Sequence, residues 1–168
     1  MERIVTLFGN PVHLEGREVK IGDKAPEFVV LNKDLKEVTL KDFAGKIKLI
    51  SATPSLDTPV CDLQARTFNQ KAFELPEEVA ILNISMDLPF AIARFCTAAG
   101  IDRIKVLSDH REASFGFNYG ILIKELRLLA RAVFVIDKND VIRYMEIVPE
   151  ITHHPDYDKA LQAVKELL

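Results

Sequence analysis

Short apolar segments alternate along this chain with segments of helical periodicity, and that alternation limits the folds that the sequence can adopt. Strands separated by helices indicate an α/β domain with a mixed sheet. The series closes with two apolar segments around the turn-forming residues 137–140, which together predict a β-hairpin. The five candidate strands cover residues 46–53, 79–85, 105–107, 131–136 and 141–147.

The segments between and after these strands carry the signals of helices. Residues 89–99 have Pro89 in the first turn, and Gly100 follows them, where a C-terminal cap favours glycine. Residues 155–168 place apolar side chains at helical spacing, so we expect one face of the last helix to be buried. A further helix is predicted over residues 60–73.

The first residues differ in pattern from the rest of the chain. Two short apolar segments, at residues 4–8 and 12–16, flank the turn-forming residues 9–11 and predict an N-terminal β-hairpin. No low-complexity tract, repeat or linker interrupts the sequence. We therefore expect a single domain over residues 1–168, in which the hairpin of residues 1–16 is an extension.

The composition restricts the classes of function. Of the 168 residues, 48% are hydrophobic and 28% are charged, and the formal net charge is -3. A chain of this length buries one substantial core, and it lacks the basic excess of a nucleic-acid-binding protein. Its apolar runs are shorter than the roughly 20 residues that cross a membrane, and its first residues do not read as a secretory signal. Two cysteines do not make a disulfide framework, so we expect a reducing, cytoplasmic setting.

One of the two cysteines, Cys61, follows the stretch PSLDTPV and stands where a helix is predicted to begin. Thr58 is a favoured N-cap and Pro59 a favoured first helical residue, which makes Cys61 the third residue of the helix. We expect the Cys61 N–H to donate to the Thr58 hydroxyl. The first turn of a helix favours negative charge and hence a thiolate.

Two flanking carboxylates, Asp57 and Asp62, oppose a thiolate at Cys61. If Cys61 is ionised, an arginine is therefore expected beside it, because an opposite charge nearby favours the charged form. The alternative from the local sequence is that Cys61 is an inert, buried apolar residue at a helix start.

The spacing Pro54-x-x-x-Thr58-x-x-Cys61 resembles the active-site motif of the peroxiredoxins, and the whole octapeptide is similar to that of their bacterial thiol peroxidase subfamily. The resemblance runs through most of the chain. It includes the N-terminal hairpin, GDKAPEF at 22–28, RFC at 94–96, SDHREASFG at 108–116 and LLARAVFVID at 128–137.

This resemblance implies a thioredoxin-like fold with a central mixed sheet, flanking helices and an N-terminal hairpin. It also implies an atypical two-cysteine peroxiredoxin that reduces hydrogen peroxide and organic hydroperoxides. Thioredoxin would be the reductant, the protein would be a homodimer, and no prosthetic group or metal would be required. A preference for alkyl hydroperoxides is also implied.

The resemblance assigns a role to four residues around the motif. Cys61 would be the peroxidatic cysteine, whose thiolate attacks the peroxide and becomes a sulfenic acid. Thr58 would hydrogen-bond the thiolate and the peroxide, and Pro54 would shield the sulfenate from solvent. Arg131 would supply the expected cation and polarise the peroxide oxygens.

The second cysteine, Cys96, corresponds to the resolving cysteine of the family, which forms an intrachain disulfide with Cys61. The residues alone allow another interpretation, in which Cys96 is a core cysteine beside Phe95 and Ala99. If Cys96 is helical, a helix has to unwind before the disulfide can form, because a disulfide needs Cα atoms within about 7 Å.

Other interpretations carry less support. The pair His153-His154 has no metal-ligand spacing, and His110 as the base of a cysteine hydrolase has no evident oxyanion hole. A general thiol–disulfide oxidoreductase usually requires C-x-x-C, which is absent. A redox sensor or binding module, switched by oxidation of one cysteine, is the alternative from a different functional class.

Overall fold

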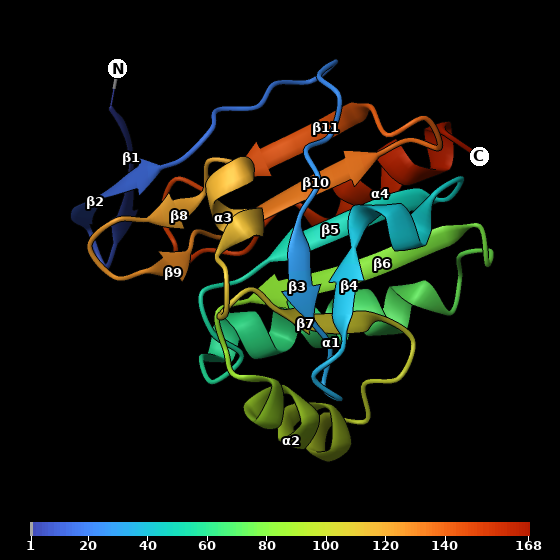
Figure 1. Ribbon diagram of the computed structural model, residues 1–168, viewed down its shortest axis with the longest axis horizontal. Helices are drawn as coiled ribbons and strands as arrows, with labels where there is room; N and C mark the ends of the chain where they lie inside the picture. The colour runs from blue at the N-terminus through green and yellow to red at the C-terminus, as the bar shows by residue number, and fades with distance from the viewer. Residues whose placement is uncertain (1) are drawn as a thin grey trace.

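The computed structural model describes residues 2–168, and a seven-stranded mixed sheet is its central element (Figure 1). The strand order is β11-β10-β5-β6-β7-β3-β4, in which β5, β6 and β7 are parallel to one another and the other pairs are antiparallel. The predicted mixed sheet is therefore confirmed. The strands are β3 (Val29–Leu31), β4 (Glu37–Thr39), β5 (Ile47–Ala52), β6 (Val79–Ser85), β7 (Lys105–Ser108), β10 (Ala132–Ile136) and β11 (Ile142–Ile147).

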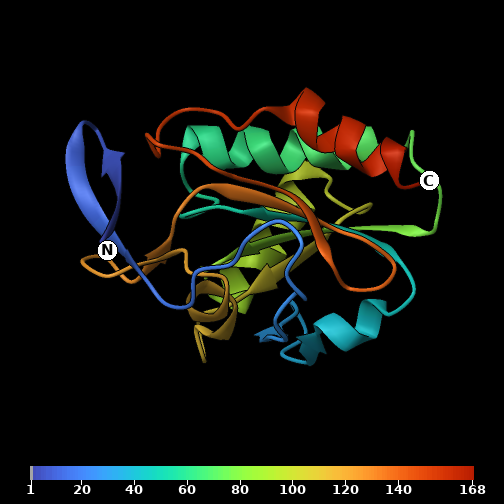
Figure 2. The ribbon, with the colours of Figure 1, turned by 90° about the horizontal axis from the view of Figure 1, so that it is seen from above.

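Two helices, α1 (Pro59–Ala72) and α4 (Tyr157–Glu166), lie side by side on one face of this sheet (Figure 2). The rings of Phe68 and Tyr157 meet edge to face between them, with centroids 5.3 Å apart. Both helices bury apolar side chains against the sheet, and for α4 this confirms the face that the sequence spacing predicts. α1 thus runs along the sheet with its first turn at the carboxyl end of β5.

The third long helix, α2 (Pro89–Ala99), packs its apolar residues into the same core as α1 and α4. It begins at Pro89 and ends at Gly100, whose φ of +67° is the left-handed conformation that a C-cap glycine adopts. Both predicted helix ends are therefore confirmed.

The opposite face of the sheet is covered by the 3₁₀ turn η1 (Leu40–Phe43) and the short helix α3 (Ser114–Asn118) (Figure 2). Aromatic rings fill this second core, and Phe115 and Tyr119 contact Phe134 of β10 edge to face.

The N-terminal hairpin belongs to a second, four-stranded sheet of order β1-β2-β8-β9. Its turn differs from the prediction: Phe8 and Gly9 form the turn, whereas Asn10 and Pro11 already pair in β2. Both turn residues have positive φ, +51° and +81°, which matches the twist of a tight hairpin. The strands are β1 (Arg3–Leu7), β2 (Asn10–Glu15), β8 (Leu122–Ile123) and β9 (Leu128–Leu129).

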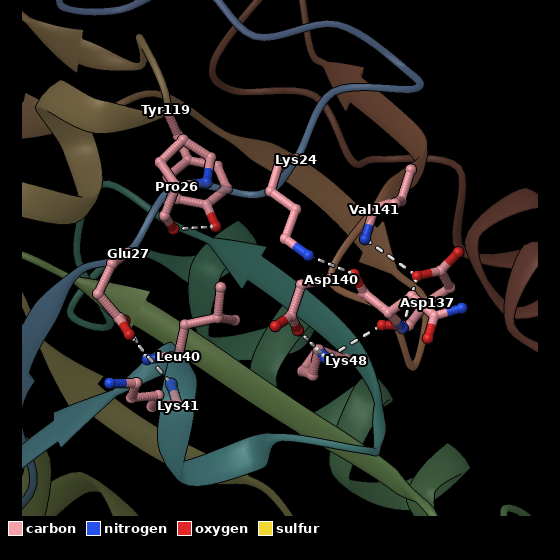
Figure 3. Close-up of polar contacts among 11 residues, drawn as sticks. Lys24, Pro26, Glu27, Leu40, Lys41, Lys48, Tyr119, Asp137, Asp140 and Val141 are labelled. Carbon is pink, nitrogen blue, oxygen red and sulfur yellow. Dashed lines mark hydrogen bonds and ion pairs between the residues drawn. The ribbon is translucent and has the colours of Figure 1, made fainter.

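A buried lysine ties the turn between β10 and β11 to the middle of the large sheet (Figure 3). The Lys48 side chain is fully buried, and its Nζ contacts the Asp140 carboxylate at 2.5 Å and the Asp137 carbonyl at 3.0 Å. A buried charge is tolerated only when it is paired and hydrogen-bonded, as it is here.

None of the helices within residues 2–168 is long and apolar enough to cross a membrane.

Candidate active site

The first turn of α1 holds Cys61 as the third helical residue, after Thr58 as N-cap and Pro59 as the first residue, as predicted. The Cys61 side chain is 0% exposed. The N–H of Asp62 donates to the Thr58 carbonyl at 2.9 Å, so the amides of Val60 and Cys61 precede the helical hydrogen bonds. The sulfur therefore lies at the positive end of the helix.

The Thr58 side chain does not cap the helix, and the prediction of a bond from the Cys61 N–H to its hydroxyl is wrong. The Thr58 hydroxyl instead donates to the Ser55 carbonyl at 3.0 Å. This contact directs the Thr58 side chain toward the turn before the helix instead of toward the first helical amides.

The two carboxylates that flank Cys61 in the sequence, those of Asp57 and Asp62, both reach solvent. Asp62 forms an ion pair with Arg66 one turn further along α1. Asp57 is exposed to solvent, where its charge is screened. Neither carboxylate is therefore a buried, unpaired charge beside Cys61.

Arg131 is the buried cation of this region. It directly precedes β10, and its residue is only 2% exposed. Its Nε donates to the Ile151 carbonyl at 2.7 Å, and its Nη1 donates to Oε1 of Gln64 at 2.8 Å. Gln64 lies on α1 one turn after Cys61, so the guanidinium is held against the helix that carries the cysteine.

Gln64 is a site residue that the sequence analysis missed. Its amide nitrogen donates to the Ser51 hydroxyl of β5, which also accepts a 3.3 Å bond from the amide of Asn83 on β6. All three residues are fully buried. A glutamine three residues after a cysteine falls on the same helix face, and that spacing is the signal that could have identified it.

An open pocket of about 490 Å³ lies over the start of α1. Pro54, Thr58 and Arg131, three of the five predicted site residues, line it together, and Val60 lines it next to Cys61. Most of the remaining surface is apolar and comes from Leu7, Phe8, Pro59, Leu128 and Ile151. His110 does not line this pocket.

Tyr157 of α4 lies within electrostatic range of both Cys61 and Arg131. Burial raises the pKa of the Tyr157 phenol, the Arg131 charge lowers it, and negative charge at Cys61 raises it. The phenol oxygen is 2.9 Å from Nδ1 of His154. His154 therefore contacts a side chain of α4. Tyr157 is a second residue near Cys61 and Arg131 that the sequence analysis did not identify as part of the site.

Cys96 lies apart from this group, on α2. It is partly buried, and both cysteines are free thiols in the structure. Burial raises the pKa of the Cys96 thiol, and the charge of Lys33 lowers it. Cys96 and Lys33 line a cavity of about 240 Å³, which is separate from the pocket over α1. The two cysteines therefore lie in different helices, Cys61 in α1 and Cys96 in α2.

Asp87 connects the loop before α1 to the start of α2. Its carboxylate accepts bonds from the Ser55 hydroxyl and the Leu56 N–H, both at 2.7 Å, and from the Ser85 hydroxyl at 2.8 Å. Asp87 directly precedes Leu88, the N-cap residue of α2. One side chain therefore joins the loop that leads into α1, the helix of Cys61, to the start of α2, the helix of Cys96.

Comparison with known sequences agrees with the family resemblance of the cysteine motif. The redoxin family matches residues 20–161. A thiol peroxidase of Halalkalibacterium halodurans is 57% identical over 164 residues, which are 98% of each chain. A thiol peroxidase of Bacillus subtilis (strain 168) is 53% identical over 164 residues, again 98% of each chain.

Solved structures resemble the chain over nearly its full length. A peroxiredoxin-like protein from Aquifex aeolicus superposes with a TM-score of 0.93 at 45% identity, covering 99% of this chain and 98% of that one. A thiol peroxidase from Chromobacterium violaceum superposes with a TM-score of 0.86 over the same shares, at 23% identity, which supports the fold alone. The prediction of a thioredoxin-like fold with an N-terminal hairpin is confirmed.

Proposed function

Because the chain belongs to the redoxin family and to its thiol peroxidases, we propose that it reduces hydrogen peroxide and organic hydroperoxides with Cys61 as the attacking residue. The observation that carries this proposal is the placement of a fully buried cysteine at a helix start whose preceding residues line an open pocket together with Arg131. A helix N-terminus and a nearby cation are the surroundings in which reactive cysteines are found in proteins.

In the first step, the Cys61 thiolate attacks the terminal oxygen of the hydroperoxide. The S–O bond forms as the O–O bond breaks, sulfur is oxidised to the sulfenic acid, and the alkoxide or hydroxide leaves and takes up a proton to give alcohol or water. Arg131, fixed by Gln64 and the Ile151 carbonyl, stabilises the negative charge that moves onto the peroxide oxygens. Thr58 and Pro54 line the entrance.

In the second step, the Cys96 thiolate attacks the sulfenic sulfur, the Cys61–Cys96 disulfide forms, and hydroxide leaves as water. Cys96 is partly buried on a different helix, so local unwinding precedes this attack. A dithiol reductant of the thioredoxin type then takes the two oxidising equivalents through thiol–disulfide exchange.

We further propose that thioredoxin is the reductant, that the protein is a cytoplasmic homodimer, and that residues 1–168 act as one domain. Support for a dimer comes from exposed apolar side chains on the helices, such as Leu63 on α1 and Phe90 on α2. Such side chains are more often covered by a partner when they lie together.

Turnover with several peroxides and a complete thioredoxin system tests the proposed function. A peroxidase consumes many equivalents of peroxide for each protein chain. A redox sensor consumes one equivalent and stops, and a thiol–disulfide oxidoreductase reduces protein disulfides without consuming peroxide. Either of the last two results contradicts the proposal.

A further inference from the structure

One face of α1 contacts the second half of α2 and the loop that follows it. The residues of this face are three and four positions apart in the sequence and are Arg66, Asn69 and Phe73, the last at the end of the helix. Their partners follow one another along the chain and are Phe95, Asp102 and Arg103. Cys96 lies within the segment that these contacts hold.

Arg66 connects the residue after Cys61 to the residue before Cys96. Its guanidinium forms an ion pair with Asp62, one turn back along α1. The same guanidinium lies over the ring of Phe95, with its central carbon 6.0 Å from the ring centroid, which is a cation–π contact. One exposed side chain therefore bridges the two helical turns that carry the cysteines.

Asn69 fixes the loop after α2 in a firmer way. It is buried, and its amide oxygen accepts from the N–H groups of Asp102 and Arg103 at 3.3 and 2.7 Å. Opening this contact would leave a buried acceptor without its donors, which costs more than losing an exposed contact. The loop at Asn69 is therefore an anchor, whereas the contact between Arg66 and Phe95 is exposed and weaker.

The anchor leaves enough free chain for Cys96 to reach the other cysteine. Asp102 follows Cys96 by six residues, and an extended chain of that length spans roughly 20 Å. Cys61 and Asn69 lie eight residues apart on α1, which corresponds to about 12 Å along the helix axis. The disulfide can therefore form while the bonds to Asn69 stay in place.

The contact between Arg66 and Phe95 does not have this freedom. In the reduced protein Cys96 lines a cavity with Lys33, and this cavity is separate from the pocket over α1. Phe95 directly precedes Cys96 in α2, so a movement that turns Cys96 toward Cys61 carries the Phe95 ring away from the guanidinium. The weaker contact is thus the one that the second step has to break.

We propose that Arg66 is a positioning residue for the second step, because its contact with Phe95 holds Cys96 in the dithiol form and opens when the disulfide forms. The loop at Asn69 stays in place and limits the segment that moves. This inference rests on the proposed function. A contact that is present only in the dithiol form shifts the equilibrium toward that form, so it makes the disulfide easier to reduce.

The test measures the equilibrium between the dithiol and disulfide forms in buffers of reduced and oxidised dithiothreitol, by mass spectrometry after rapid alkylation of free thiols. The main variant is Arg66→Gln, which removes the charge of an exposed side chain and keeps a good helix former. We expect the equilibrium constant for reduction of the disulfide to fall by about two- to fivefold, or roughly 10–20 mV, the value of an exposed cation–π contact. Arg66→Lys keeps a cation and should stay nearer the wild-type value.

A double-mutant cycle tests whether Arg66 acts through Phe95. Phe95→Leu removes the ring and keeps an apolar side chain against the core. In this background Arg66→Gln should shift the equilibrium by much less than it does alone, because the contact is already lost.

Arg103→Gln is the matched control. The Arg103 guanidinium lies over the Phe73 ring, 4.2 Å from its centroid, so this change removes a contact of the same kind between α1 and the anchored loop. The N–H that donates to Asn69 is part of the backbone and is kept. We expect Arg103→Gln to leave the equilibrium unchanged, because its contact is present in both redox forms.

Two results would overturn the inference. In one, Arg66→Gln leaves the equilibrium unchanged, or shifts it equally in the wild-type and Phe95→Leu backgrounds. In the other, Arg103→Gln shifts the equilibrium as much as Arg66→Gln, which would mean that the loop after α2 also moves. Failure of the proposed function is distinguishable, because the wild-type protein would then form no Cys61–Cys96 disulfide after one equivalent of peroxide.

Discussion

Arg131 Nη1 donates a hydrogen bond to Gln64 Oε1 at 2.8 Å, and this contact joins the strand end that supplies the cation to the helix that carries Cys61. The far side of the Gln64 amide is fixed by Ser51, so the amide presents its oxygen to the guanidinium. A buried guanidinium held by two hydrogen bonds is preorganised, which suits the role proposed for Arg131 in stabilising charge on the peroxide.

Replacing Gln64 with alanine removes this support, and we expect the rate of the peroxide step to fall by roughly 10- to 100-fold, the value of a hydrogen bond to a charged group. Gln64→Glu keeps an acceptor for Arg131 and should retain more of the rate. Gln70→Ala, which changes an exposed glutamine of the same helix, is the control. A stopped-flow rate for Gln64→Ala equal to that of wild type would contradict this role.

Replacing Asp87 with alanine should change the two chemical steps in opposite directions. The loop before α1 loses its bonds from Ser55 and Leu56, so the peroxide step slows. Unwinding becomes easier, so the disulfide forms faster once the sulfenic acid exists. Rapid-quench mass spectrometry follows both steps, with Asp158→Ala, an exposed carboxylate of α4, as the control. Slower disulfide formation with an unchanged peroxide step would rule out this role for Asp87.

Asp109 predicts a dependence of stability on pH. Burial raises the pKa of Asp109 from 3.8 to about 6, although the N–H groups of Gly116 and Phe115 donate to its carboxylate. Between these values the folded state binds more protons than the unfolded state, so the contribution of Asp109 to the free energy of unfolding falls as pH rises.

Urea melts of the wild type and Asp109→Asn between pH 4 and pH 7 measure this contribution. We expect the free energy of unfolding of the wild type, relative to that of the variant, to decrease as pH rises through this range. Comparing the two proteins cancels the groups that they share. A difference that does not vary with pH would show that Asp109 titrates at its ordinary value.

The oxidised protein should gain less stability than its new covalent bond suggests. A Cys61–Cys96 bridge closes a loop of about 36 residues, which by chain entropy alone corresponds to roughly 3–4 kcal/mol. The helix that unwinds to form it loses packing in the core shared by α1 and α2, and that loss offsets part of the gain. Denaturant melts of both redox forms test this, and a full gain of the loop value would mean that no helix is lost.

The sequence predicted the long elements well, because their signals are local. Pro89 and Gly100 mark both ends of α2, and Thr58-Pro59 marks the start of α1. The elements that were missed have two to five residues, such as β8, β9 and α3, and are too short to show a period. Their formation depends on pairing and packing with distant parts of the chain.

The residues of the candidate site also divide into those with local sequence signals and those whose partners are distant in the sequence. A motif placed Pro54, Thr58 and Cys61 together, but the partners of Arg131 could not be read from its neighbours in the sequence. Gln64 and the Ile151 carbonyl reach it from positions 67 and 20 residues away. The Thr58 hydroxyl shows a further limit of prediction from sequence. The local sequence allows it to cap the helix or to bond the turn at Ser55, and in the structure it donates to the Ser55 carbonyl.

The most direct measurement follows peroxide consumption by the wild type, Cys61→Ser and Cys96→Ser, with and without a thioredoxin system. We expect sustained turnover by the wild type. Cys96→Ser should consume about one equivalent and then stall with Cys61 as a sulfenic acid that is open to further oxidation. Cys61→Ser should consume none, because a serine hydroxyl is not ionised at neutral pH. Removing an essential nucleophile should lower the rate by much more than tenfold. Peroxide consumption by Cys61→Ser at more than about a tenth of the wild-type rate would therefore contradict the assignment of Cys61.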